Sequence, residues 1–179
     1  MIRGNNLYLR ALTTEDVGDL LALEQTNRSF FENFSMDRSE EFYTEQGQLR
    51  RMRLIRKRRE NDEEYHYGIF LQTQQLIGVI NLFQVYRGPL QRAFIGYFLD
   101  KSYNGRGYMT EAVKLLVNEG FDKLQLHRIE AGVMPHNIGS IRVLEKAGFH
   151  KEGIAKKNVK INGVWEDHQV LARLNPADE

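Results

Sequence analysis

The segment FIGYFLDKSYNGRGYMTEAVKLLVNEGF, residues 94–121, combines three patterns that decide the fold of this chain. Residues 94–99 are apolar or aromatic apart from one glycine, which is typical of a buried strand. Polar residues and two further glycines, Gly105 and Gly107, then interrupt the pattern. Apolar residues recur at helical spacing from Met109 to Phe121, so the segment predicts a strand, a glycine-rich loop and an amphipathic helix.

The loop between this strand and helix has the properties of an anion-binding site. The first N–H groups of a helix have no partner within it, and the helix dipole places partial positive charge at the same end. Glycines let a phosphate approach the backbone closely, and Arg106 adds a positive charge. The same glycines are equally typical of a simple tight turn. Tyr108 stands where a P-loop needs lysine, and Thr110 stands where a dinucleotide-binding loop needs its third glycine, so neither motif is present.

Length and composition limit the class of protein. A chain of 179 residues fits one domain, and its 41% hydrophobic and 27% charged residues are ordinary for a globular protein. The net charge of +1 favours no polyanionic partner, and the absence of cysteine excludes disulfides, thiolate metal sites and a cysteine nucleophile. The sequence shows no signal peptide and no membrane-spanning stretch. We therefore expect one domain, residues 1–179, in a cytoplasmic protein without membrane contact.

The N-terminal part predicts a strand followed by two helices. Residues 7–12 alternate as a strand does, and Thr13 precedes acidic residues that suit the start of a helix carrying Val17 to Leu23. We expect residues 29–34 to form a connection whose three phenylalanines pack in the core or wall a ligand site. Ser39 is expected to cap the second helix, which would continue beyond residue 55.

The second helix ends in a dense run of basic residues followed by acidic ones. The run comprises Arg50, Arg51, Arg53, Arg56, Lys57, Arg58 and Arg59, and the acids are Glu60, Asp62, Glu63 and Glu64. A basic run of this kind can contact RNA or the ribosome through the Arg50–Arg59 surface. It is more simply a solvated helix face whose charge the acids partly offset. No aromatic residues interleave with it, as single-strand binding would require.

The remainder of the chain alternates strands with two helices. Its predicted strands are 65–71, 76–86, 91–99, 128–134 and a hairpin from residue 149 that turns at Asn162 and Gly163. A helix is predicted over 138–147, with Gly148 at its C-terminal cap. This order of elements predicts an α/β (α+β) fold in which helices flank one mixed sheet.

Two stretches, GYFLDKSYNGRGYMTEA at 96–112 and HRIEAGVMPHNIGSIRVLEKAGFHKEG at 127–153, resemble two blocks of a known family. The chain is similar to the GNAT superfamily of N-acetyltransferases, and in particular to its RimJ/RimL-type branch of ribosomal-protein N-terminal acetyltransferases. Asn104 and Met109 depart from the strict loop pattern of the superfamily, Gln/Arg-x-x-Gly-x-Gly/Ala. The resemblance covers nearly the whole chain and implies a single mixed, mostly antiparallel central sheet with helices on both faces.

The resemblance implies acetyl-CoA as cosubstrate and assigns roles to residues around it. The backbone of Phe98 and Leu99 would bind the pantetheine arm, the loop 104–110 would hold the pyrophosphate, and Asn137 would contact the cofactor arm. Ser140 would donate a proton to the departing thiolate. The expected binding residues are therefore Phe98, Leu99, Asn104, Gly105, Arg106, Gly107, Tyr108, Met109, Thr110, Asn137 and Ser140. Asn137 also suits a helix cap by its own chemistry.

The proton-transfer groups are less well defined by the sequence. Many members of the superfamily use a tyrosine one turn after Ser140, and Leu144 occupies that position here, which shifts the role to Ser140 or to water. A serine at this point also serves as a structural helix residue. Some relatives carry a glutamate base on the central strand, where this chain has Phe94. The remaining candidates for the base are Asp167, His168, His136 and Glu130, and the sequence does not say which of them faces the amine.

The resemblance implies direct attack of an amine on the thioester, without a covalent enzyme intermediate. The histidines lack the spacing of metal ligands, so no metal is expected. The leading acceptor is the N-terminal α-amine of a protein, of the ribosomal-protein-alanine type. Small amines, such as polyamines, amino sugars or antibiotics, are an alternative, and so is a non-catalytic module that binds acyl-CoA or RNA. Both a monomer and a homodimer are compatible with the sequence.

Overall fold

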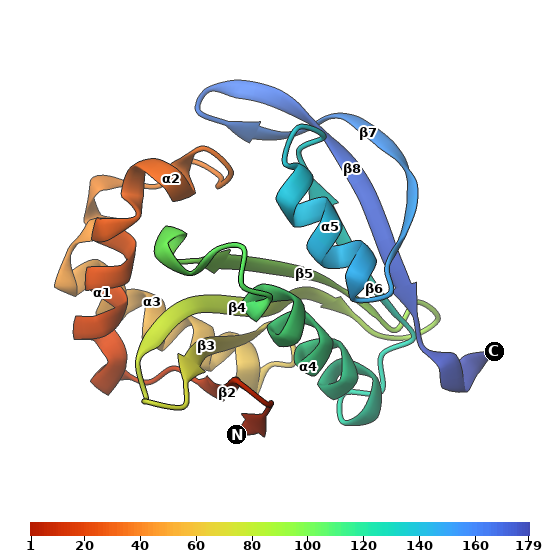
Figure 1. Ribbon diagram of the computed structural model, residues 1–179, viewed down its shortest axis with the longest axis horizontal. Coiled ribbons are helices and arrows are strands. Elements are labelled where there is room, and N and C mark those ends of the chain that lie inside the picture. The colour runs from red at the N-terminus through yellow and green to blue at the C-terminus, as the bar shows by residue number, and fades with distance from the viewer.

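The computed structural model describes residues 1–179 as one eight-stranded sheet flanked by helices (Figure 1). The sheet has the order β1-β2-β3-β4-β5-β6-β8-β7, and only the pair β5–β6 is parallel. The strands are β1 (Ile2–Arg3), β2 (Leu7–Ala11), β3 (Tyr65–Leu71), β4 (Leu76–Tyr86), β5 (Arg92–Leu99), β6 (Arg128–Val133), β7 (His150–Ile161) and β8 (Val164–Leu174). The structure thus confirms the predicted mixed, mostly antiparallel sheet.

Five α-helices connect and cover the strands. They are α1 (Val17–Thr26), α2 (Arg28–Glu32), α3 (Glu45–Glu60), α4 (Tyr108–Asp122) and α5 (Ile138–Lys146). Four short 3-10 turns occur at Thr14–Asp16, Glu40–Tyr43, Lys101–Tyr103 and Pro176–Asp178. None of the helices combines the length and the apolar character that crossing a membrane requires.

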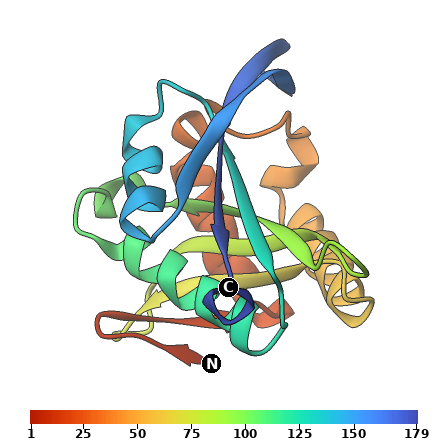
Figure 2. The same cartoon turned by 90° about the vertical axis from the view of Figure 1, so that its right-hand side faces the viewer.

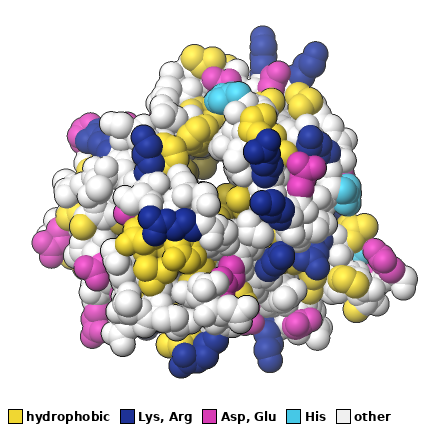
Figure 3. All heavy atoms as spheres, in the orientation of Figure 1, with side chains coloured by type: hydrophobic (Ala, Val, Ile, Leu, Met, Phe, Trp, Pro, Cys, Tyr) yellow, Lys and Arg dark blue, Asp and Glu magenta, His cyan; other side chains and the backbone are white.

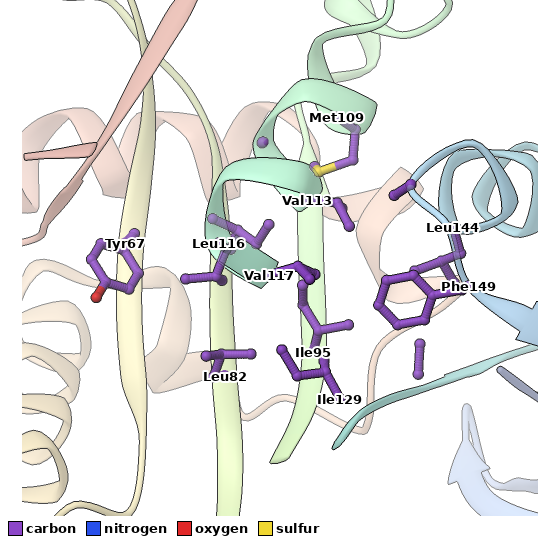
Figure 4. Close-up of a cluster of buried hydrophobic side chains, with 14 of the residues drawn as sticks. Tyr67, Leu82, Ile95, Met109, Val113, Leu116, Val117, Ile129, Leu144 and Phe149 are labelled. Carbon is purple, nitrogen blue, oxygen red and sulfur yellow. The ribbon is translucent and has the colours of Figure 1, made fainter. Parts of the chain in front are cut away.

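Two hydrophobic clusters lie on opposite faces of the sheet. The larger one contains the apolar face of α4, including Met109, Val113 and Leu116, and packs on alternate residues of the strands (Figure 4). The smaller one lies under α1 and α3. Neighbouring residues of β3 divide between them, because successive strand side chains point to opposite faces: Ile69 belongs to the larger cluster and Phe70 to the smaller.

The strands β5 and β6 separate soon after they meet. Their pairing is confined to Arg92–Phe94 on β5 and Arg128–Glu130 on β6. Beyond these residues β6 turns away and continues with β8 and β7 at a steep angle to β3, β4 and β5 (Figure 2). The backbone groups of residues 95–99 on the side that faces β6 therefore have no neighbouring strand, and a V-shaped opening results.

Two predictions for the N-terminal part were wrong. The segment 29–34 is not a connection throughout, because residues up to Glu32 belong to the short helix α2, and Phe31 is fully buried. Ser39 does not cap α3. It precedes the 3-10 turn Glu40–Tyr43 without a capping hydrogen bond, and Thr44 caps α3 by accepting a hydrogen bond from the Gly47 N–H. The apolar pattern gave no sign of this break at residue 44.

The hairpin β7–β8 reaches back to the N-terminal part of the chain. Its turn residues, Asn162 and Gly163, have positive φ angles of 50° and 77°, as a two-residue hairpin turn requires. The Asn162 N–H donates to Asp37 Oδ1 at 3.0 Å, and its side-chain amide donates to the Glu32 carbonyl at 3.1 Å. The hairpin therefore bridges the mouth of the V to the segment that follows α2 (Figure 1).

A buried carboxylate connects α1, α3 and the segment after α2. Glu24 is fully buried and accepts hydrogen bonds from Arg38 at 2.8 Å and from Arg51 at 3.2 Å. The Arg38 guanidinium also lies over the ring of Phe98 on β5, 5.1 Å from its centroid. Because buried charges are stable only when they are paired, this group fixes the position of the segment beside the V.

Replacing Glu24 by Ala is expected to lower the free energy of unfolding by about 3–5 kcal/mol, because the partly buried guanidinium groups of Arg38 and Arg51 lose their fully buried counter-charge. Denaturant unfolding followed by circular dichroism measures this change. The matched control is Glu60→Ala, which removes an exposed carboxylate 3.4 Å from Arg56 and is expected to change the stability by less than about 0.5 kcal/mol. Equal losses for the two variants would contradict the structural role of Glu24.

Candidate active site

A cleft of about 430 Å³ occupies the V between β5 and β6. Residues of β5, of the loop 103–110 and of α5 line it, together with phenylalanines of the α2 segment. Tyr97 and Phe98 both line the cleft, although neighbouring strand residues point to opposite faces of a sheet. The cleft therefore passes through the sheet and is open to both of its faces. Figure 3 shows the hollow, with hydrophobic side chains inside it, between the α2 and α5 regions.

The glycine-rich loop forms one end of the cleft. Gly105 and Gly107 have φ angles of +80° and +81°, and a Cβ at either position would meet no atom within 4 Å. Both glycines are therefore required by the backbone conformation, while the space beside them is open. Gly107 is the N-cap of α4 and provides no side chain to the N–H groups of the first turn, which remain free to bind an anion.

The helix α5 begins beside the same cleft. Asn137 caps it, because the Asn137 Oδ1 accepts a hydrogen bond from the Ser140 N–H at 3.3 Å. The predicted cap is thus present. The cap leaves the side-chain nitrogen of Asn137 available to donate into the cleft, which both residues line.

A phenol and a hydroxyl meet in the lining of the cleft. The Tyr97 hydroxyl on β5 lies 2.7 Å from Ser140 Oγ on α5, a hydrogen bond in which either oxygen can donate. Burial raises the pKa of Tyr97 to about 12, and the hydrogen bond to Ser140 acts in the opposite direction. At neutral pH the phenol keeps its proton, so Tyr97 can donate to Ser140 while Ser140 donates to a group in the cleft.

Basic side chains stand at the mouth of the cleft. Arg142 and Lys146 lie one turn apart on α5, are exposed, and line the cleft. Neither takes part in an ion pair within the protein, whereas most other arginines do. In Figure 3 dark-blue side chains gather on the α5 side of the hollow. The mouth therefore favours an anionic ligand.

All predicted binding residues but one line the cleft. Those that do are Phe98, Leu99, Asn104, Gly105, Gly107, Tyr108, Met109, Thr110, Asn137 and Ser140. Arg106 is exposed outside the lining, with its guanidinium 5.5 Å from the centre of the Tyr103 ring. The sequence analysis did not identify Tyr97, Arg142 or Lys146. The helical spacing of Arg142 and Lys146 after Asn137 was the available signal for the two basic residues, whereas only the folded structure brings Tyr97 to Ser140.

Leu144 cannot act as the proton donor for which the family resemblance implies a tyrosine at this position. It is fully buried within the larger hydrophobic cluster, beside Phe149 (Figure 4). The Tyr97 phenol comes instead from the strand that faces α5. A tyrosine is thus present at Ser140, but a different element supplies it.

Three of the four candidate bases are hydrogen-bonded to other residues or exposed to solvent. Glu130 accepts a hydrogen bond from Arg128 Nε at 2.7 Å and lies 3.6 Å from Arg92. Asp167 accepts the backbone N–H of Lys157 at 2.8 Å and so stabilises the irregular part of β7. His136 is exposed, and its ring lies against that of Phe34, with 6.2 Å between their centres.

His168 differs from these three candidates. Its exposed fraction is 7%, and its Nδ1 atom is buried without a hydrogen-bond partner. Burial lowers the pKa of His168, against the opposing effects of the Glu166 backbone and of the Glu166 and Asp167 charges. The imidazole is therefore neutral at pH 7 and carries a lone pair. No group of three or more His, Asp or Glu side chains is arranged to hold a metal ion.

The basic run of α3 is largely neutralised within the protein. Arg50, Arg51, Arg56 and Arg58 pair with Glu41, Glu24, Glu60 and Glu64, in that order. Arg59 lies over the rings of Tyr65 and Tyr67. This arrangement favours the interpretation of the run as a helix face whose charge is offset.

Comparison with known proteins identifies a family and relatives of this chain. The acetyltransferase (GNAT) domain family matches residues 6–150. The probable N-acetyltransferase YjcK of Bacillus subtilis (strain 168) is 62% identical over 100% of this chain and 99% of its own. The [ribosomal protein uS5]-alanine N-acetyltransferase of Escherichia coli (strain K12) is 30% identical over 96% of this chain and 89% of its own.

A solved structure shows the same architecture. Mycobacterium smegmatis RimJ in complex with CoA-disulfide superimposes with a TM-score of 0.90 at 26% identity, covering 94% of this chain and 81% of that one. The likeness therefore extends over nearly all of the fold described above.

Proposed function

Since the chain belongs to the GNAT family of N-acetyltransferases, we propose that it transfers an acetyl group from acetyl-CoA to the N-terminal α-amine of a protein, by direct attack in a ternary complex. The observation that carries the proposal is the cleft through the sheet, which has an anion-binding loop at one end and the Ser140–Tyr97 pair in its lining. The 30% identical relative acts on the alanine of ribosomal protein uS5, which supports a protein N-terminus as acceptor.

The residues of the cleft suit a CoA thioester. The free N–H groups at the start of α4, with open space beside Gly105 and Gly107, fit the pyrophosphate, and Arg142 and Lys146 supply positive charge nearby. The unpaired edge of β5 at Leu99 offers backbone groups to the amides of the pantetheine arm, as a neighbouring strand would, whereas the Phe98 carbonyl faces β4. RimJ of M. smegmatis, which has the same architecture, was solved with a CoA-disulfide.

When bound, acetyl-CoA would supply a thioester whose carbonyl carbon an amine can attack. The chain's own groups orient the reactants and handle charge. The backbone N–H of Leu99 would bind the carbonyl oxygen as negative charge develops on it, because the Phe98 carbonyl of the same peptide faces β4 and the N–H therefore faces the V. Ser140 donates a proton to the sulfur when the C–S bond breaks, and Tyr97 replaces the proton on Ser140. Positioning within the narrow cleft supplies the remaining part of the rate enhancement.

We also propose that residues 1–179 act as one catalytic domain. The family match ends at residue 150, yet β7 and β8 follow that point and complete the sheet, with β8 paired to β6. The hairpin also contacts the segment after α2 through Asn162. Its removal would leave the β6 side of the cleft without support.

Binding at the loop is tested by the thermal shift caused by acetyl-CoA. At a hundred times its dissociation constant, a ligand that binds only the folded protein stabilises it by about 2.7 kcal/mol. The variant Gly107→Glu is expected to abolish the shift, because a side chain and a negative charge enter the anion site. The control Gly88→Glu is at a glycine that also has a positive φ, +64°, and no atom within 4 Å of its Cβ position, but it lies outside the cleft, so it retains the shift. An unchanged shift in Gly107→Glu would contradict the proposed loop site.

The acceptor is tested with a panel of free amines. A peptide that begins with alanine is expected to be acetylated at its N-terminus, as mass spectrometry detects. The matched control is the same peptide with a blocked N-terminus and an internal lysine, which should remain unmodified. Turnover of spermidine or an amino sugar, without turnover of any peptide, would contradict the protein-acceptor part of the proposal and leave the acetyltransferase part intact.

The proton donor is tested by combining two substitutions. Ser140→Ala is expected to lower kcat by about 10²–10⁴-fold, the usual contribution of a positioned acid, and Tyr97→Phe by less. Because Tyr97 acts through Ser140, the double variant should be no slower than Ser140→Ala alone. Tyr86→Phe, at an exposed tyrosine outside the cleft, is the control. Additive losses in the double variant would show that the two hydroxyl groups act independently.

A further inference from the structure

We infer that His168 is the general base that removes the proton of the acceptor amine, and that the amine reaches it from the sheet face opposite α4 and α5. This inference rests on the proposed acetyl transfer and deepens it, because it assigns the group that the sequence left open. It also states from which side the acceptor enters.

The backbone of β6 is open on this face where it leaves β5. Phe94 pairs with Glu130, so the residues two positions further along each strand, Gly96 and Gly132, lie on the same face of the sheet. A Cβ at Gly96 would lie 3.2 Å from atoms of Asn81 and Phe83, so side chains of β4 cover β5 at this level. Gly132 is exposed, and the three atoms nearest to where its Cβ would be all belong to His168, so a groove lies over β6 between the β4 side chains and His168.

His168 forms the wall of this groove on the β8 side. Gly132 pairs with Val170, and His168 is two residues away on the same strand, so its side chain lies on the same face as Gly132. A Cβ at Gly132 would lie 3.7 Å from atoms of the His168 ring. The imidazole therefore occupies the space beside the bare backbone of β6, where an acceptor entering the groove would meet it.

The groove lies on the same face of the sheet as part of the cleft lining. Phe98 lies two residues beyond Gly96 on β5, points to the groove side, and lines the cleft. Tyr97 points to the other face, where it contacts Ser140. An amine from the groove and a thioester held beside Ser140 thus approach the V from opposite faces of the sheet.

The state of the imidazole suits a base. His168 Nδ1 is buried without a hydrogen-bond partner, so we assign the uptake of the proton to Nε2, the other ring nitrogen. The charges that act on it, from Glu166 and Asp167, stabilise the imidazolium that forms when it takes up a proton. The residues that face it from β6 and β7, Gly132 and Ala155, carry no charge.

The protons balance when His168 and Ser140 act in one turnover. The neutral amine attacks the carbonyl carbon, an N–C bond forms, and His168 accepts one proton from the nitrogen. The C–S bond breaks, and the sulfur receives a proton from Ser140, which Tyr97 supplies in turn. Solvent then returns the proton from the imidazolium to Tyr97, so the products are an N-acetylated amine and CoA thiol.

The kinetic test compares His168→Gln with the wild type. The expected result is a kcat about 10²–10⁴-fold lower, with loss of the decrease in kcat that protonation of the base causes at acid pH. The acetyl-CoA thermal shift should be unchanged, because His168 does not touch the loop. In His168→Ala, added imidazole should restore part of the activity. The matched control is His127→Gln, at a half-exposed histidine that bonds to Asp178 outside the cleft, and it should behave as the wild type does.

Two results would overturn the inference. One is a His168→Gln variant that keeps more than a third of the wild-type kcat, and the other is a loss of the acetyl-CoA shift together with activity, which indicates a structural role. A second measurement is independent of turnover: the imidazole signals of wild-type protein, assigned with His168→Gln, are followed by nuclear magnetic resonance. With CoA present, an alanine-starting peptide should move the His168 signals and leave those of His127 unchanged. If no acceptor is turned over, the proposed function fails, while an unmoved His168 signal refutes the inference by itself.

Discussion

The separation of two parallel strands is the constraint on which the rest of this structure depends. Parallel neighbours cannot be joined by a tight turn, so the chain leaves β5, crosses the sheet through α4 and returns as β6. The apolar face of α4 holds both strands, because its side chains pack on Ile95 of β5 and Ile129 of β6 within one cluster (Figure 4). The strands can therefore part beyond residue 94 without loss of the core. The unpaired backbone that results is costly when dry, and it is stable here because it lines a cleft that water or a ligand can fill.

The ends of both parallel strands lead into helices at the same cleft. After β5 the chain reaches the N-terminus of α4, and after β6 it reaches that of α5. The two helix N-termini differ in their caps. Gly107 leaves the first turn of α4 without a side-chain cap, whereas Asn137 caps α5 with its side-chain oxygen. The N–H groups of an uncapped start bind water or a ligand, so the difference distinguishes an open anion site from a helix start that its own side chain satisfies. Ser140 is precise in position because its own N–H is part of that cap.

The sequence predicted the elements that local patterns determine and missed those that depend on tertiary contacts. The strands β3 and β4, the helix α4 and the hairpin turn at Asn162 were predicted correctly, since apolar periodicity and turn residues act over a few positions. The helix α2 was missed because its five residues are too few to show a period. Thr44 replaced Ser39 as cap because both residues have the right chemistry, and only the intervening turn distinguishes them. The meeting of Tyr97 with Ser140, 43 positions apart, follows from the register of the sheet and has no local signal.

The alternation of one strand separates an acid from a base. Tyr97 and Phe98 are adjacent in sequence, yet they face opposite sides of β5, so the proton donor lies with α5 and the acceptor groove lies with β8. Burial shifts the pKa of each group in the direction that acid–base catalysis at neutral pH requires. It raises the pKa of Tyr97 to about 12 and so keeps the phenol protonated, and it lowers the pKa of His168 and so keeps the imidazole unprotonated. Both shifts favour the neutral form, which is the form that can donate at Tyr97 and accept at His168. The sheet keeps the two groups on opposite faces. The divergence of β5 and β6 leaves an opening between them for the reacting atoms.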